Sequence, residues 1–189
     1  MFYALVYYPQ IDHQGFQAFR RKYEPYSALL PEHLPVVFPV PESIGYKNLV
    51  DHIEKVLEKW TLFDIHISGH TKTWDHWLML LLQEGNKKTI RLHDDLYTEL
   101  LAPHLREDLH YLPHIGLGHF SKEAYDFNNP TAELELDKAS YEQALSEVQA
   151  LNLDFWRTVD TLTLVKVNKD FTKCWNIMEF KMSHPRAVK

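Results

Sequence analysis

The chain has a single cysteine, Cys174, among its 189 residues. One thiol can form neither an internal disulfide nor a thiolate pair for a metal, and this cysteine usage is typical of a cytoplasmic protein. Apolar runs such as Trp77 to Leu82 are far shorter than the ~20 residues of a membrane-spanning helix. The first residues, MFYALVYYP, lack the basic head and cleavage site of a signal peptide. We therefore expect a cytoplasmic protein with no membrane partner.

Glycine and positive charge are also scarce. The chain has 6 glycines, and none of the glycine patterns of a P-loop, a dinucleotide fold or a nucleophile elbow occurs. Acidic residues number 26 against 20 basic ones, which gives a net charge of -6. That charge repels a nucleic-acid backbone over most of the surface. Any nucleic acid must therefore bind at a local site.

What the sequence does contain is core material and histidine. Hydrophobic residues make up 45% of the chain and aromatic residues 13%, which is ample for a packed core and excludes disorder. The length suits one domain, or two small lobes. There are 12 histidines. Histidine titrates near neutral pH and binds metals, so a few of them are candidates for chemistry and the rest are expected to be structural.

Periodicity along the chain predicts strands that outnumber helices. Alternating apolar residues predict strands, and apolar residues three or four apart predict helices. The expected strands are 2–8, 34–40, 62–68, 74–83, 112–120, 159–167 and 174–182, and the expected helices are 11–23, 46–60, 89–101 and 136–151. Prolines place the second strand at a sheet edge. Residues 121–130 are expected to be a loop, and 183–189 a frayed tail.

Two short segments echo each other in the two halves of the chain. His33-Leu34-Pro35 and His114-Ile115-Gly116 each begin a hydrophobic strand, and a proline precedes each histidine within two residues. Since the strands mostly arrive in hairpins, we expect an α+β fold of mainly antiparallel sheets with outer helices. The echo predicts two pseudo-symmetric lobes, which together form one domain over residues 1–189.

At these residues the chain resembles the two-histidine phosphoesterase superfamily, also called the 2′-5′ RNA ligase-like family. In that family each lobe contributes one H-x-T/S motif to a shared cleft. The resemblance extends over nearly the whole chain, through YALVYYP, FDIHISGH with WLMLLL, RLHDDLY, VDTLTLVKV and WNIMEFKM. It implies that His33 and His114 are the catalytic acid and base, that the substrate is a nucleotide or an RNA-end phosphate, and that no metal or other cofactor is needed.

The sequence departs from the family pattern at the third position of both motifs. Pro35 and Gly116 stand where the family has a Thr or Ser whose hydroxyl donates a hydrogen bond to the phosphate. Proline can donate nothing, and glycine keeps only its amide. His66 and Ser68, on the polar face of their strand with Asp64, are candidates to replace the missing hydroxyls. Tyr7 and His119 are further candidates.

Other features have a structural and a functional interpretation. His66, His70 and His76 suggest zinc, but their spacing crosses a strand end and fits no zinc motif, so we expect no metal site. His119 is expected to point away from His114 across a regular strand, unless a bulge at Gly118 turns it inward.

The basic run Arg20 to Lys22 is also open to both interpretations. It either stabilises a helix C-terminus or forms a phosphate-facing patch.

The sequence thus predicts a metal-independent phosphoesterase acting on a 2′,3′-cyclic phosphate or a small nucleotide phosphodiester. The alternative, favoured by the two missing hydroxyls, is a catalytically degenerate nucleotide- or RNA-binding module. The sequence predicts no particular oligomeric state.

Overall fold

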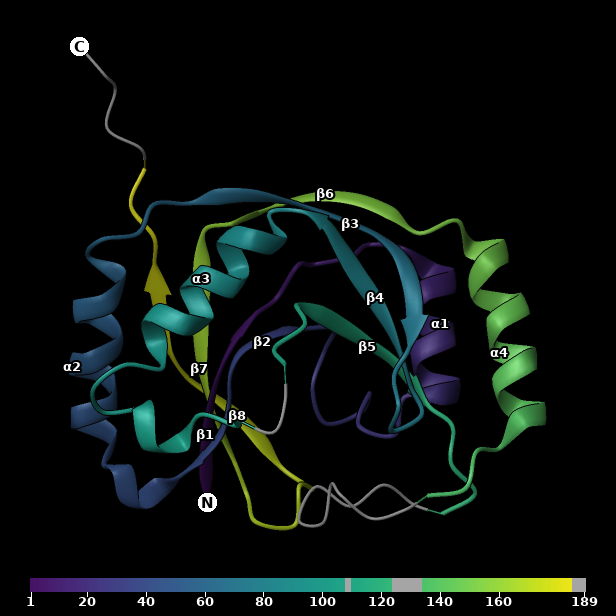
Figure 1. Ribbon diagram of the computed structural model, residues 1–189, viewed down its shortest axis with the longest axis horizontal. Coiled ribbons are helices and arrows are strands. Elements are labelled where there is room, and N and C mark those ends of the chain that lie inside the picture. Colours follow the sequence, from purple (N-terminus) through teal and green to yellow (C-terminus); the bar gives the residue numbers. More distant parts are fainter. Residues whose placement is uncertain (108–109, 124–133, 185–189) are drawn as a thin grey trace.

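The computed structural model describes residues 1–107, 110–123 and 134–184. Most of the expected loop 121–130 and most of the expected tail 183–189 lie outside these residues. Within them the chain forms two four-stranded sheets with helices on their flanks (Figure 1). All strand pairs are antiparallel. The α+β class expected from the sequence is confirmed, and among the described residues no helix is long and apolar enough to cross a membrane.

The first sheet joins the beginning of the chain to its end. Its order is β2-β1-β7-β8, from strands β1 (Phe2–Tyr7), β2 (Leu34–Pro41), β7 (Thr161–Val167) and β8 (Cys174–Lys181). β2 lies at the edge, as its prolines predicted. Its backbone is also bonded from outside the sheet: Val36 O accepts from the His93 ring, and Phe38 N donates to the Tyr97 hydroxyl.

The second sheet is built from the middle of the chain. Its order is β5-β4-β3-β6, from β3 (Phe63–Lys72), β4 (Trp77–Glu84), β5 (His114–His119) and β6 (Asp154–Val159). The expected burial pattern of β3 is confirmed, since Phe63, Ile65 and Ile67 are buried whereas Asp64 is exposed. The edge strands β2 and β5 contact each other, which brings the two histidine motifs to the same region.

Four α-helices cover the two sheets. α1 (Gln14–Tyr23) and α4 (Lys138–Leu151) pack together on the side of β5, and α3 (Asn86–Leu96) packs between α2 (Tyr46–Leu57) and β2. Figure 1 shows α2 on one flank and α1 with α4 on the other, with the strands between them. Short 3-10 helices occur at Glu42–Ile44 and Ala102–His104. One large apolar cluster extends through both sheets and all four helices.

Two local expectations are corrected by the structure. The first helix begins at Gln14 rather than residue 11, and its N-cap is His13, whose Nδ1 accepts from Phe16 N at 3.1 Å. An imidazole nitrogen with a lone pair can cap a helix as a carboxylate does. The strand expected at 159–167 is observed as β7, and a strand that the pattern does not predict, β6, precedes it with only Asp160 between them.

Candidate active site

The two motif histidines occupy equivalent positions on the two edge strands. His33 immediately precedes β2, and His114 is the first residue of β5. His33 Nδ1 lies 2.8 Å from Pro31 O, and His114 Nδ1 lies 2.5 Å from Leu112 O. A carbonyl oxygen can only accept, so in each ring Nδ1 carries the hydrogen and the neutral ring presents the Nε2 lone pair. Among the described residues neither Nε2 has a hydrogen-bond partner.

The surroundings of both rings favour their neutral forms. The pKa of His33 is lowered to about 4, mainly by burial. The hydrogen bond to Pro31 opposes this shift, whereas positive charge on Arg20 or His114 adds to it. Burial is also the main cause that lowers the pKa of His114. The free protein therefore holds two neutral imidazoles near neutral pH.

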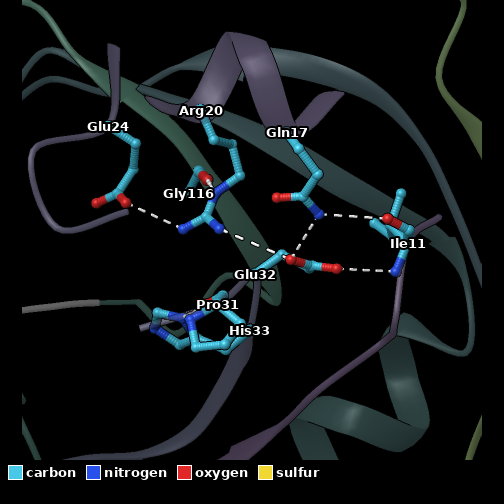
Figure 2. Close-up of polar contacts among 8 residues, drawn as sticks. All are labelled: Ile11, Gln17, Arg20, Glu24, Pro31, Glu32, His33 and Gly116. Carbon is cyan, nitrogen blue, oxygen red and sulfur yellow. Dashed lines mark hydrogen bonds and ion pairs between the residues drawn. The ribbon is translucent and has the colours of Figure 1, made fainter. Parts of the chain in front are cut away.

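A buried arginine connects the two motifs from the side of α1. Arg20 is 2% exposed, and its Nε donates to Gly116 O at 3.1 Å. Its guanidinium also pairs with Glu24 at 3.0 Å and with Glu32, the residue before His33, at 3.9 Å. Figure 2 shows the guanidinium between the two carboxylates, with Gly116 beside it. Arg20 thus contacts the third residue of one motif and a neighbour of the other.

The carboxylate of Glu32 is held by further hydrogen bonds. It accepts from Ile11 N and from the Gln17 side chain, both at 2.9 Å (Figure 2). Each oxygen of this buried carboxylate therefore has a donor, as a buried charge requires. The chain just before His33 is fixed through this network.

A second connection joins the segment before His114 to the first motif. The hydroxyl of Tyr111, three residues before His114, donates to Pro35 O at 2.7 Å. The Tyr111 ring stacks on His93 of α3 with centroids 3.8 Å apart, and His93 in turn bonds to β2 at Val36. Pro35 of the first motif thus accepts a hydrogen bond from Tyr111, which is close to His114 in the sequence. Gly116 of the second motif accepts one from Arg20, which pairs with the residue before His33.

His66 and Ser68, the candidate replacements for the missing hydroxyls, both lie on β3 beside β6. In the β3–β6 pair, His66 lies opposite Trp156 and Ser68 opposite Asp154. His66 Nε2 is 2.9 Å from Asp154, and its ring stacks on Trp156 with centroids 4.7 Å apart. Both candidates are half-buried and lie two strands away from β5, which corresponds to ~10 Å at the usual strand spacing.

Tyr7 makes a structural contact of its own. It is 5% exposed within the main core, and its hydroxyl donates to Thr158 O at 2.9 Å. Burial raises its pKa to about 12. Its hydroxyl is therefore already engaged in holding β1 to β6.

His119 lies on the same face of β5 as His114. The β4–β5 register is Leu81↔His114, Met79↔Gly116 and Trp77↔His119, with a shift that leaves Leu117 as an extra residue. This bulge reverses the alternation, because two residues on one strand then oppose one on the other. The exception anticipated at Gly118 is therefore the observed arrangement. The ring itself bonds to Asp75 O at 3.0 Å and to Ser121.

The three histidines considered for zinc lie apart. His66 bonds to Asp154, His76 to Leu134 O, and His70 lies opposite Leu80 in the β3–β4 pair. Within residues 1–107, 110–123 and 134–184, no group of three His, Cys, Asp or Glu side chains converges as metal ligands do.

Sequence reasoning named Arg20 only as part of a possible phosphate-facing patch, and it missed the buried contacts of Arg20 and the role of Tyr111. The basic run at 20–22 is divided by the structure: Arg20 is buried, Arg21 is exposed, and Lys22 pairs with Glu147 of α4 at 2.7 Å. The signal in the sequence for a buried Arg20 was the presence of Glu24 and Glu32, because nearby carboxylates can pair with an arginine that lies in the protein interior. Tyr111 had no local signal.

Comparison with known proteins finds the same fold. The family model described as the 2'-5' RNA ligase superfamily matches residues 7–171. Among solved structures, TT0787 of Thermus thermophilus has a TM-score of 0.63 at 14% identity, covering 97% of this chain and 99% of that chain. E. coli LigT complexed with 3'-AMP has a TM-score of 0.61 at 15% identity, covering 97% of both chains. No match was found among curated protein sequences.

Structural similarity at such low identity establishes the fold, and the family model establishes membership because it matches most of the chain. The paired histidines at the starts of β2 and β5 lie within the matched region. This chain belongs to the 2'-5' RNA ligase superfamily.

Proposed function

We propose that the chain is a metal-independent phosphoesterase that hydrolyses a 2′,3′-cyclic phosphate or a small nucleotide phosphodiester. The observation that carries this proposal is the matched geometry of His33 and His114, each with Nδ1 bonded to a carbonyl two residues earlier and Nε2 without a partner among the described residues. Two imidazoles with the same tautomer, close to each other, are suited to general acid-base catalysis.

The proposed reaction uses one histidine as a base and the other as an acid. The Nε2 of one neutral ring takes a proton from water, whose oxygen attacks phosphorus. The P–O bond to the leaving ribose oxygen breaks, and the protonated partner gives that oxygen its proton. The bound phosphate is negative, so it favours protonation of one ring, whereas the mutual repulsion of the rings disfavours protonation of both.

The relatives support the substrate class. E. coli LigT has been crystallised with 3'-AMP, phosphate, NADP+ and ATP. A nucleotide or an RNA-end phosphate between the two lobes is accordingly the ligand that we propose here, with a cytoplasmic location as expected from the single cysteine.

The test is hydrolysis of 2′,3′-cyclic AMP with and without a chelator. We expect chelator-insensitive turnover, and a loss of ~10²–10⁴-fold in His33→Ala and in His114→Ala, the usual contribution of a general acid or base. His184→Ala, at an exposed histidine after β8, is the control and should keep the wild-type rate. Undiminished turnover in both motif variants would contradict the proposal.

The second candidate, a binding module without catalysis, is favoured by Pro35 and Gly116. Restoring the hydroxyls as Pro35→Thr and Gly116→Thr tests it. A Cβ at Gly116 meets only the Trp77 ring, at 3.6 Å, so the new side chain has room. One recovered hydrogen bond to the phosphate should raise turnover about ten-fold, since ~1.4 kcal/mol corresponds to a factor of ten. If neither protein reacts but 3'-AMP binds in a histidine-dependent way, the binding module is the better description.

A further inference from the structure

A hollow of about 290 Å³ lies between the end of α2, the start of β3 and α3. None of its residues belongs to the histidine motifs or to β2 and β5. The residues that line it are Lys59, Trp60, Thr61, Phe63, Lys88, Arg91 and Asp95. Its volume is close to the lower end of small-molecule sites, ~300 Å³.

Three cations converge on this hollow from two different elements. Lys59 follows α2, and Lys88 and Arg91 lie one turn apart on α3; all three are exposed. Among the described residues none of them forms an ion pair. Asp95 is the single acid in the lining, so the hollow is positive on a protein whose net charge is -6. Such a local reversal of charge attracts an anion.

The walls of the hollow are aromatic. Trp60 is half-buried and its ring centroid lies 5.9 Å from that of buried Phe63, over which Lys88 Nζ lies at 5.7 Å. Trp60 Nε1 donates to Asp95 Oδ2 at 3.0 Å, which fixes the indole. Asp95 Oδ1 has no hydrogen-bond partner among the described residues. A flat ligand with an N–H group can therefore stack on Trp60 and donate to Asp95.

We propose that this hollow binds a nucleoside monophosphate, with the base against Trp60 and the phosphate between Lys88 and Arg91. The inference does not depend on catalysis at the histidine pair. Cations for a phosphate, an aromatic surface for a base and a carboxylate oxygen for an exocyclic amine are the three features that such a ligand needs.

The experiment is an NMR titration with 5′-AMP in the His33→Ala/His114→Ala background, which removes the proposed catalytic histidines. The chain has 5 tryptophans, and Trp60→Phe identifies the Trp60 indole N–H signal. We expect 5′-AMP to shift that signal in a saturable way, with affinity that falls as salt increases. Lys88→Gln/Arg91→Gln should weaken binding at least ten-fold.

The matched control is Lys87→Gln/Lys169→Gln, which removes the same charge at two exposed lysines outside the hollow and should leave the affinity unchanged. Adenosine and inorganic phosphate, titrated separately, should each bind more weakly than 5′-AMP. The proposal is overturned if 5′-AMP leaves the Trp60 signal unmoved, if the Lys88/Arg91 variant binds as tightly as the control, or if adenosine binds as tightly as 5′-AMP.

Discussion

At the scale of single residues, the surroundings of His33 favour its neutral form. Because burial lowers its pKa to about 4, the ring should be neutral at pH 6 in the free protein. Titration of its Cε1–H signal by NMR should show this low pKa, and 3'-AMP should raise it. An unshifted value near ~6.5, the value of an isolated histidine, would mean that the ring is well solvated.

The same lowered pKa affects stability. The unfolded chain takes up a proton at this histidine below pH ~6.5, whereas the folded chain does so only near pH 4. The free energy of unfolding should therefore fall as pH decreases from 6.5 toward 4. Urea denaturation at pH 7 and pH 5 should show a smaller loss in His33→Gln, which has no titrating ring.

Arg20 should contribute far more to the free energy of unfolding than Arg21. Arg20→Gln leaves Glu24 and Glu32 buried without their cation, and breaking a buried pair typically costs ~3–5 kcal/mol. Arg21→Gln, one residue along at an exposed position, should change the free energy of unfolding by less than ~0.5 kcal/mol. Equal midpoints for the two variants in chemical denaturation would show that the ion pairs contribute nothing.

At the scale of elements, the bulge in β5 gives its two glycines different tolerances. A Cβ at Gly118 would lie 2.7 Å from Tyr23 Cβ and 3.0 Å from the Phe120 ring, so Gly118→Ala forces α1 or β5 to move. Overpacking of this kind costs ~1–3 kcal/mol. Gly116→Ala has an ordinary contact of 3.6 Å and should cost less than ~1 kcal/mol. Thermal unfolding of the two variants distinguishes these values, and equal losses would contradict the close contact of α1 with β5.

The elements show where sequence patterns suffice and where they fail. β3 was predictable because its apolar residues alternate regularly. β6 was not, since exposed Trp156 blurs its alternation and only one residue separates it from β7. Likewise, the equivalent positions of His33 and His114 at the starts of two edge strands followed from a repeated local motif. The role of Arg20 did not, because it depends on Glu32 and Gly116, which only the folded chain brings together.

At the scale of the whole molecule, the continuous apolar core predicts that the two sheets unfold together. The main cluster includes buried residues of both sheets, and β6 continues into β7 through one residue. Variants that keep only Trp156 of β6 or only Trp175 of β8 as fluorescent reporters should therefore give the same denaturation midpoint. Two separate midpoints would mean that the lobes are independent domains rather than the single domain expected from the sequence.

The order of the strands also determines when the protein can fold during its synthesis. β3 to β6 are contiguous enough to assemble once residue 159 has left the ribosome. β1 can pair with β2 early, but its other partner β7, in the register Leu5↔Leu164, and the edge strand β8 are made last. Pairing across such a distance is slow, because the intervening chain must first be brought together. The sheet that ends in β5 can therefore be complete before the sheet that ends in β2, whose other two strands, β7 and β8, are the last to be made.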